Sequence, residues 1–243
     1  MKSSNPKFLI SINLHNDTYF DDQLRNIQEH LKFDYTIVLN CNNKMYDLLK
    51  NTKYENVLIN PETIEKKKFH GSIFQGIFEN LKFADKLVEH DYFIVLSARS
   101  FFFKKLDLDC VGSFYENSKC YNSRSIDFTP KTKLEKEGWP KTMWQNFICS
   151  DFYLFLQNNK FNFKKKMHEG MVLTKKNCED IISFFDKNRD LYESIINTNN
   201  PVEEYVIQSL LLNWQNFTNC IGVWPTCESN PCFMEKSFVR KRY

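Results

Sequence analysis

Residues 56–105 read NVLINPETIEKKKFHGSIFQGIFENLKFADKLVEHDYFIVLSARSFFFKK, and their pattern indicates the fold class. A short apolar run, Val57–Ile59, precedes apolar residues at helical spacing between Ile73 and Leu87, and a second apolar run, Tyr92–Leu96, follows. Continuous apolar runs of this kind are typical of strands buried on both faces of a parallel sheet. The stretch therefore predicts a strand–helix–strand unit. Because ligands bind at the carboxyl ends of such strands, Ser97–Ser100 are expected at the mouth of a site.

The same alternation extends toward the N-terminus. Phe8–Leu14 and Tyr35–Leu39 are predicted strands, and Asp21–Leu31 and Met45–Leu49 are predicted helices. Together with the two apolar runs of residues 56–105, these strands predict an α/β fold with a mostly parallel, Rossmann-like central sheet of adjacent strands. The chain has only 6 Gly and lacks the glycine-rich dinucleotide fingerprint, so NAD is not expected.

The C-terminal half has fewer regular patterns. We predict helices at Trp144–Leu156, Lys175–Phe185 and Val202–Trp214, and strands at Met171–Leu173 and Cys220–Trp224. There is no internal repeat or linker composition, which favours one domain over residues 1–243.

Composition narrows the function classes. The formal net charge is +3 over 243 residues, which argues against general nucleic-acid binding. No apolar run has transmembrane length and no signal peptide is evident, so a soluble, cytoplasmic chain without a membrane span is expected. The 8 cysteines include no CxxC pair, so the spacing predicts no zinc site. The basic run Lys66–Lys68 is expected to be solvated surface.

Several short segments, in order along nearly the whole chain, resemble one family. They are Leu14-His15, residues 35–40 (YTIVLN), His70-Gly71-Ser72, residues 92–98 (YFIVLSA), His168-Glu169-Gly170, Pro201-Val202-Glu203 and residues 238–241 (FVRK). This set is similar to glycosyltransferase family 14, the core-2/I-branching β-1,6-N-acetylglucosaminyltransferases and the peptide O-xylosyltransferases.

The resemblance implies a GT-A-type fold, with a nucleotide-binding half at about residues 1–105 and an acceptor and catalytic half at about residues 106–243. It also implies inverting transfer of a GlcNAc- or xylose-like sugar from a UDP-sugar to a hydroxyl of a glycan or glycoprotein acceptor, with no metal or other cofactor. Glu203 matches the catalytic base. The implied donor-binding residues are His15, Asn40, His70, Gly71, Ser97, Ser100, Arg240 and Lys241, and the implied acceptor-binding residues are Trp144 and Glu169. Asn40 and Ser100 depart from the family, which has Asp at both positions.

The chemistry of an inverting transfer agrees with this assignment. The acceptor hydroxyl needs a base, for which Glu203 is suited, whereas Glu204 would point about 100° away on a helix. The leaving diphosphate needs positive charge, and residues 97–100 contain no carboxylate to hold a metal there. Arg240 and Lys241 are therefore expected to fold back toward Ser97–Ser100 and neutralise the diphosphate.

Simpler explanations stay open for each candidate. Glu203 and Glu204 suit a helix N-terminus by charge alone, residues 240–242 suit a basic tail, and His70-Gly71 suits a turn before a helix. Asp107-Leu108-Asp109 is a literal Asp-x-Asp motif. The alternatives to the metal-independent enzyme are therefore an Asp-x-Asp metal-dependent glycosyltransferase and a catalytically idle binding module on the same fold.

Overall fold

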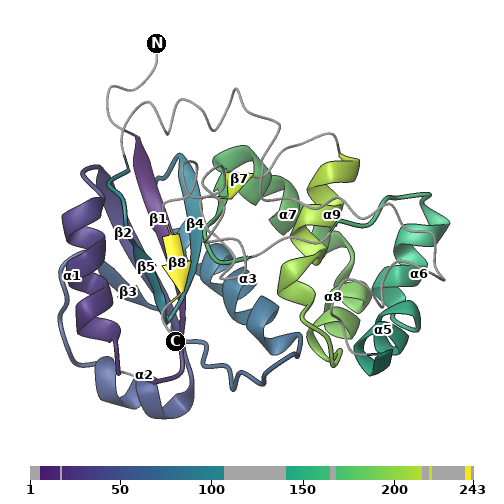
Figure 1. The fold of residues 1–243 in the computed structure, drawn as a ribbon, viewed down its shortest axis with the longest axis horizontal. Coiled ribbons are helices and arrows are strands. Elements are labelled where there is room, and N and C mark those ends of the chain that lie inside the picture. Colours follow the sequence, from purple (N-terminus) through teal and green to yellow (C-terminus); the bar gives the residue numbers. More distant parts are fainter. Residues whose placement is uncertain are drawn as a thin grey trace.

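The structure, a computed structural model, describes residues 6–16, 18–106, 141–164, 168–214, 219–220 and 239–241. A six-stranded sheet lies at its centre (Figure 1). Its strands are β1 (Lys7–Leu14), β2 (Asp34–Cys41), β3 (Val57–Ile59), β4 (Tyr92–Ser97), β6 (Met171–Thr174) and β7 (Asn219–Cys220). Their spatial order is β3-β2-β1-β4-β6-β7.

The first four strands are adjacent and mutually parallel, which confirms the prediction made from the apolar runs. The strand β6 joins the edge of β4 in the antiparallel direction, and β7 joins β6 in the same way. The result is a mixed α/β fold with a mostly parallel sheet, compatible with a Rossmann-like architecture. Only Cys220, the first residue of the predicted strand Cys220–Trp224, lies in β7, because residues 221–224 lie outside the described ranges.

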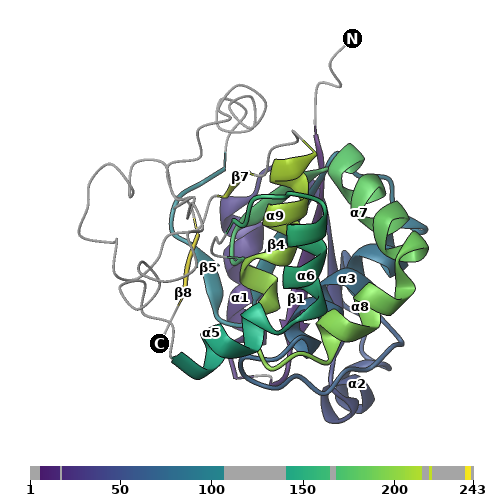
Figure 2. The ribbon, with the colours of Figure 1, turned by 90° about the vertical axis from the view of Figure 1, so that its right-hand side faces the viewer.

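Helices cover both faces of the sheet. The helices α1 (Phe20–His30) and α2 (Asn43–Leu49) lie on one face, and α3 (Ser72–Asp85) and α7 (Lys175–Lys187) pack directly on the other. Beside α3 and α7 lie α5 (Lys141–Ile148), α6 (Asp151–Asn158), α8 (Arg189–Ile196) and α9 (Val206–Asn213) (Figures 1 and 2). Successive side chains of β1 lie on opposite faces of the sheet. Phe8 and Ile10 pack with Ile27 of α1, whereas Leu9 packs with Phe74 of α3.

A second, two-stranded sheet forms from segments far apart in sequence. The strand β5 (Ser100–Phe102) pairs antiparallel with β8 (Val239–Lys241), so Ser100 lies opposite Lys241 and Phe101 opposite Arg240. Neither strand is predicted from local pattern. The pairing confirms that the basic C-terminal segment folds back toward Ser97–Ser100.

Two of the predicted helices are interrupted. The predicted helix at Trp144–Leu156 is divided into α5 and α6, because the Ser150 hydroxyl accepts the backbone N–H of Tyr153 and starts a new helix. The predicted helix at Val202–Trp214 is divided into a single 3₁₀ turn, η2 (Val202–Glu204), and α9. Tyr205 separates them with φ −140°, outside the helical region, because its ring is fully buried among Phe147, Phe152 and Phe163. The predicted helix at Lys175–Phe185 is confirmed by α7, whereas α8 is not predicted.

Asn80 on α3 connects this helix to two strands. Its Nδ2 atom donates to the Ser11 hydroxyl at 3.0 Å and to the Val38 carbonyl at 3.1 Å, and its Oδ1 atom accepts from Asn60 at 3.4 Å. Asn80→Ala should lower the free energy of unfolding by about 1–3 kcal/mol, because buried polar partners are left unsatisfied. Urea denaturation measures this loss. The exposed Asn197→Ala should cost less than about 1 kcal/mol, and equal losses in the two variants would contradict the role given to Asn80.

Within the described ranges, no helix combines the length and the apolar character that crossing a membrane requires.

Candidate functional site

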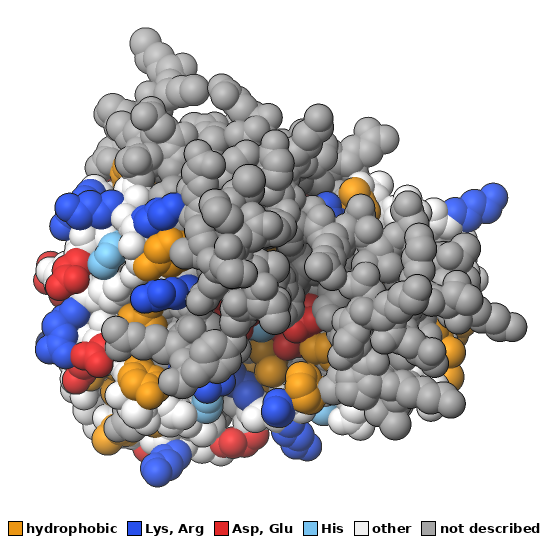
Figure 3. All heavy atoms as spheres, in the orientation of Figure 1, with side chains coloured by type: hydrophobic (Ala, Val, Ile, Leu, Met, Phe, Trp, Pro, Cys, Tyr) orange, Lys and Arg blue, Asp and Glu red, His pale blue; other side chains and the backbone are white. Residues whose placement is uncertain are grey.

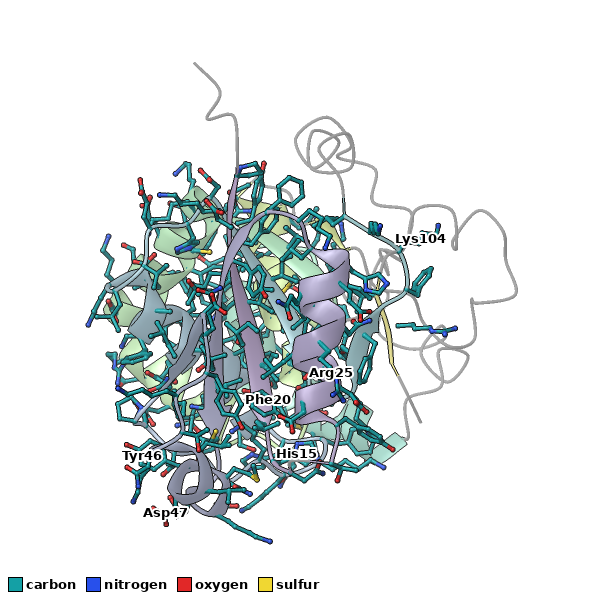
Figure 4. All side chains as sticks on the ribbon, turned by 90° about the vertical axis from the view of Figure 1, so that its left-hand side faces the viewer. His15, Phe20, Arg25, Tyr46, Asp47 and Lys104 are labelled. Atoms are coloured by element: carbon teal, nitrogen blue, oxygen red, sulfur yellow. The ribbon has the colours of Figure 1, made fainter. Side chains whose placement is uncertain are left out.

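A cavity of about 500 Å³ opens at the carboxyl ends of β1 and β4. After β1 the chain builds β2 and β3 on one side, and then places β4 on the other side of β1. The two carboxyl ends therefore flank the switch point of the sheet, where open α/β sheets bind ligands. Figure 4 shows His15, which follows β1 and lines the cavity, at the opposite end of the sheet from Lys104.

Three polar residues lie side by side near the carboxyl ends of neighbouring strands. Asn13 of β1 lies opposite Asn40 of β2 and Ser97 of β4. Asn13 is 8% exposed and donates from Nδ2 to the carbonyl of Ile73 at 2.8 Å. Its Oδ1 atom is buried and has no hydrogen-bond partner among the described residues. Because Asn13 lines the cavity, this oxygen is available to a ligand that donates a hydrogen bond.

Four cationic side chains line the cavity. They are Lys66, Lys67 and Lys68 from the loop before α3, and Arg99 from the turn after β4. Lys67 and Lys68 are exposed, as expected for a solvated run, but Lys66 is not, so the surface expectation is wrong for that residue. The Lys66 ammonium donates to the carbonyl of Asn40 at 3.0 Å and to that of Ile64 at 3.1 Å. Burial lowers the pKa of Lys66 to about 8.

Three carboxylates also line the cavity. Glu169 precedes β6, and Glu203 and Glu204 belong to η2. Glu203 is 4% exposed, and the Glu169 Oε2 atom lies 3.3 Å from Nδ1 of His168, another cavity residue. The expectation that only Glu203 faces the site is wrong, because Glu204 also lines the cavity. That expectation assumed α-helical spacing, whereas the two residues lie on a short 3₁₀ turn.

The structure brings together four of the residues assigned from the resemblance: His15, Ser97, Glu169 and Glu203. Asn40, His70, Gly71, Ser100 and Arg240 are not among the residues that line the cavity. Asn40 still contributes indirectly, because its carbonyl and its Oδ1 atom both accept from Lys66.

His70 and Gly71 have structural contacts at the start of α3. The His70 Nδ1 atom accepts the backbone N–H of Ser72 at 3.0 Å, which satisfies a group at the helix start. Partial burial, with a contribution from Lys67, lowers the pKa of His70 and so favours the neutral ring that can accept this bond. Gly71 donates its N–H to the carbonyl of Thr198 at 2.9 Å.

Ser100 and Arg240 also contact other residues of the protein. Ser100 is fully buried, and its hydroxyl bonds the N–H and hydroxyl of Ser97 within one turn. The guanidinium of Arg240 lies 5.8 Å from the centre of the Phe103 ring. The diphosphate role of Arg240 and Lys241 stays a prediction. The side chains of Lys241 and Trp144, and all of Asp107 and Asp109, lie outside what the structure describes.

Sequence reasoning missed Asn13 and Lys66 as lining residues that point to chemistry, whereas Arg99 belongs to the segment 97–100 that was expected at the mouth of the site. Asn13 has a detectable signal, because it is a polar residue at the end of an apolar strand and alternates with the inward-facing Ile12 and Leu14. Lys66 has no local signal that separates it from the two exposed lysines beside it. In the described part of the chain, no group of three or more His, Cys, Asp or Glu side chains is arranged to hold a metal ion.

The visible surface agrees with the low net charge. In Figure 3, Lys and Arg side chains are interspersed with Asp and Glu side chains around α1 and α2, at the left of the view. Charged side chains of both signs and His also occur at the lower centre, where Figure 1 shows the carboxyl ends of the parallel strands.

No model of a protein family matches this chain, and a search of curated proteins finds no match either.

Proposed function

We propose that this protein is an inverting, metal-independent glycosyltransferase that moves a GlcNAc- or xylose-like sugar from a UDP-sugar to a hydroxyl of a glycan or glycoprotein acceptor. The observation that supports this proposal best is the presence of both cations and carboxylates in the lining of one cavity at the switch point of the sheet. Lys66–Lys68 and Arg99 supply the positive charge, and Glu169, Glu203 and Glu204 supply the negative charge.

The cationic side chains suit an anionic leaving group. When the bond between sugar and diphosphate breaks, negative charge develops on the leaving phosphate oxygen. Fixed positive charges within reach of that oxygen stabilise the transition state, as a divalent metal does in other enzymes. Arg99 adds a planar guanidinium that can bind two phosphate oxygens at once.

The carboxylates suit the acceptor. Inversion requires attack from the face of the sugar opposite to the leaving group, so the base must reach that face. Glu203 lines the cavity and is almost fully buried, a setting in which its position is held by the surrounding packing. In the proposed reaction it takes the proton of the acceptor hydroxyl as the new bond to the sugar forms.

The first test is release of UDP from UDP-GlcNAc and UDP-xylose by the purified protein, with and without EDTA. We expect release with at least one donor and no change on addition of EDTA, because protein cations neutralise the leaving group. Loss of activity in EDTA would instead support a metal-dependent enzyme. UDP binding without turnover of either donor would support an idle binding module, which the replacement of the family's Asp by Asn40 and Ser100 also favours.

A further inference from the structure

Lys66 occupies an unusual position at the inner side of the cavity. Its ammonium donates to three oxygens, namely the Asn40 carbonyl at 3.0 Å, the Asn40 Oδ1 atom at 2.5 Å and the Ile64 carbonyl at 3.1 Å. These bonds tie the loop that contains Lys66 to the carboxyl end of β2. All three acceptors are electrically neutral. They hold the ammonium in place but supply no negative charge to balance it.

The close packing around Lys66 depends on a glycine of α3. A Cβ atom added to Gly76 would lie 2.9 Å from Cε of Lys66 and 2.4 Å from Oδ1 of Asn13. The absence of a side chain at Gly76 therefore leaves room for a cation and a hydrogen-bond acceptor next to each other, both on the cavity lining.

Lys66 forms no ion pair with another described residue. Among the described residues, the ion pairs formed by lysines involve Lys7, Lys50, Lys82, Lys175 and Lys176, but not Lys66. Burying a cation without an opposite charge is costly, and burial accordingly lowers the pKa of Lys66 to about 8. A cation that is partly desolvated, held in place and exposed to a cavity is suited to an anionic ligand.

The identity of residue 40 affects the net charge around the Lys66 ammonium. Asn40 bonds Lys66 through Oδ1 and donates from Nδ2 to the carbonyl of Glu62 at 2.8 Å. An aspartate of the same shape would place a full negative charge beside the ammonium. The amide keeps the same grip on Lys66 and leaves its charge available.

We propose that Lys66 is the anion-binding residue at the inner side of the cavity, positioned by Asn40, and that its counter-ion is a phosphate group of the bound ligand. The identification of that ligand as a nucleoside diphosphate rests on the proposed function, whereas the affinity for a diphosphate group does not. Arg99, Lys67 and Lys68 add further positive charge around the same ligand.

Binding of the anion should be linked to protonation of Lys66. Near and above pH 8 part of the free Lys66 is neutral, and a bound phosphate favours the charged form, so the complex takes up protons. Two titratable neighbours in the loop and strand, Glu65 and Cys41, both favour the charged form of Lys66. The other charged or titratable groups that line the same cavity as Lys66 are His15, Lys67, Lys68, Arg99, His168, Glu169, Glu203 and Glu204.

The test is calorimetric titration with pyrophosphate and with UDP. Lys66→Met removes the charge, Asn40→Asp balances it while preserving shape, and Lys32→Met is a control that removes an exposed lysine. Both Lys66→Met and Asn40→Asp should weaken binding by about 10–100-fold, the scale of one charge-assisted contact. Lys32→Met should bind as the wild type does. Thermal denaturation of each variant verifies that it is folded.

A second readout separates charge from structure. At about pH 8.5, titrations in buffers of different ionisation enthalpy should show more proton uptake for the wild type than for Lys66→Met. Pyrophosphate affinity within about twofold of the wild type in both folded variants, or equal proton uptake, would overturn the proposal. Lys66-dependent pyrophosphate binding without transfer from any donor would support this inference while contradicting the proposed function. Sugar transfer that neither substitution slows would support the proposed function while contradicting this inference.

Discussion

Glu203→Gln should lower the rate of sugar transfer by about 10²–10⁴-fold, the usual scale for loss of a general base. Glutamine preserves the size and shape of the side chain but cannot take the proton of the acceptor hydroxyl. The affinity for UDP should stay close to that of the wild type, because the phosphates are expected to contact the cationic side chains that line the cavity. Steady-state transfer assays and UDP titration of the same preparation separate the two effects.

Two further substitutions make this result specific. Glu179→Gln changes the same chemical group on the exposed side of α7 and should leave the transfer rate unchanged. Glu204→Gln identifies which carboxylate acts, because both glutamates of η2 line the cavity. If Glu204→Gln abolishes transfer and Glu203→Gln does not, Glu204 is the base. If all three variants retain full activity, η2 has no catalytic role.

Gly71→Ala should lower the free energy of unfolding by about 3 kcal/mol or more, the upper range for forcing atoms into a packed interior. A Cβ atom at this position would lie 2.2 Å from the carbonyl oxygen of Ile195 and 2.6 Å from two backbone atoms of Ile196. These are backbone atoms at the end of α8, so no side-chain rotation relieves the overlap. Urea or thermal denaturation measures the loss.

The same contact matters for the site. The N–H of Gly71 donates to Thr198, which lies between α8 and the turn that carries Glu203 and Glu204. Separating α3 from α8 should therefore also weaken catalysis in any Gly71→Ala protein that folds. Lys86→Ala, an exposed change just after α3, should stay within about 0.5 kcal/mol of the wild type. A Gly71→Ala protein as stable as Lys86→Ala would show that the two helices separate without cost.

Much of the fold follows from local pattern. The predicted strand Val57–Ile59 matches β3 residue for residue, and the strands at Phe8–Leu14, Tyr35–Leu39 and Tyr92–Leu96 each lie within the observed element. The reason is that a strand buried on both faces is apolar at most positions, which leaves a signal in a few consecutive residues. The location of the cavity also follows, because the carboxyl ends of parallel strands meet at one edge.

Features that depend on distant partners did not follow from pattern. The pairing of β5 with β8 joins residues 100–102 to residues 239–241, and each strand is too short to leave a periodic signal. The interruption at Tyr205 depends on burial of its ring among Phe147, Phe152 and Phe163, which outweighs the local preference for one continuous helix.

The sequence by itself determined the α/β class, the adjacent and parallel arrangement of the first four strands and the edge of the sheet at which the cavity opens. Only the tertiary structure decided that Lys66 and Glu204 also line that cavity. Lys66, Lys67 and Lys68 are chemically identical, yet only Lys66 meets the carbonyl of Asn40 and turns inward. A local pattern records how apolar a segment is, whereas the environment of a single charge is set by residues that folding brings beside it from elsewhere in the chain.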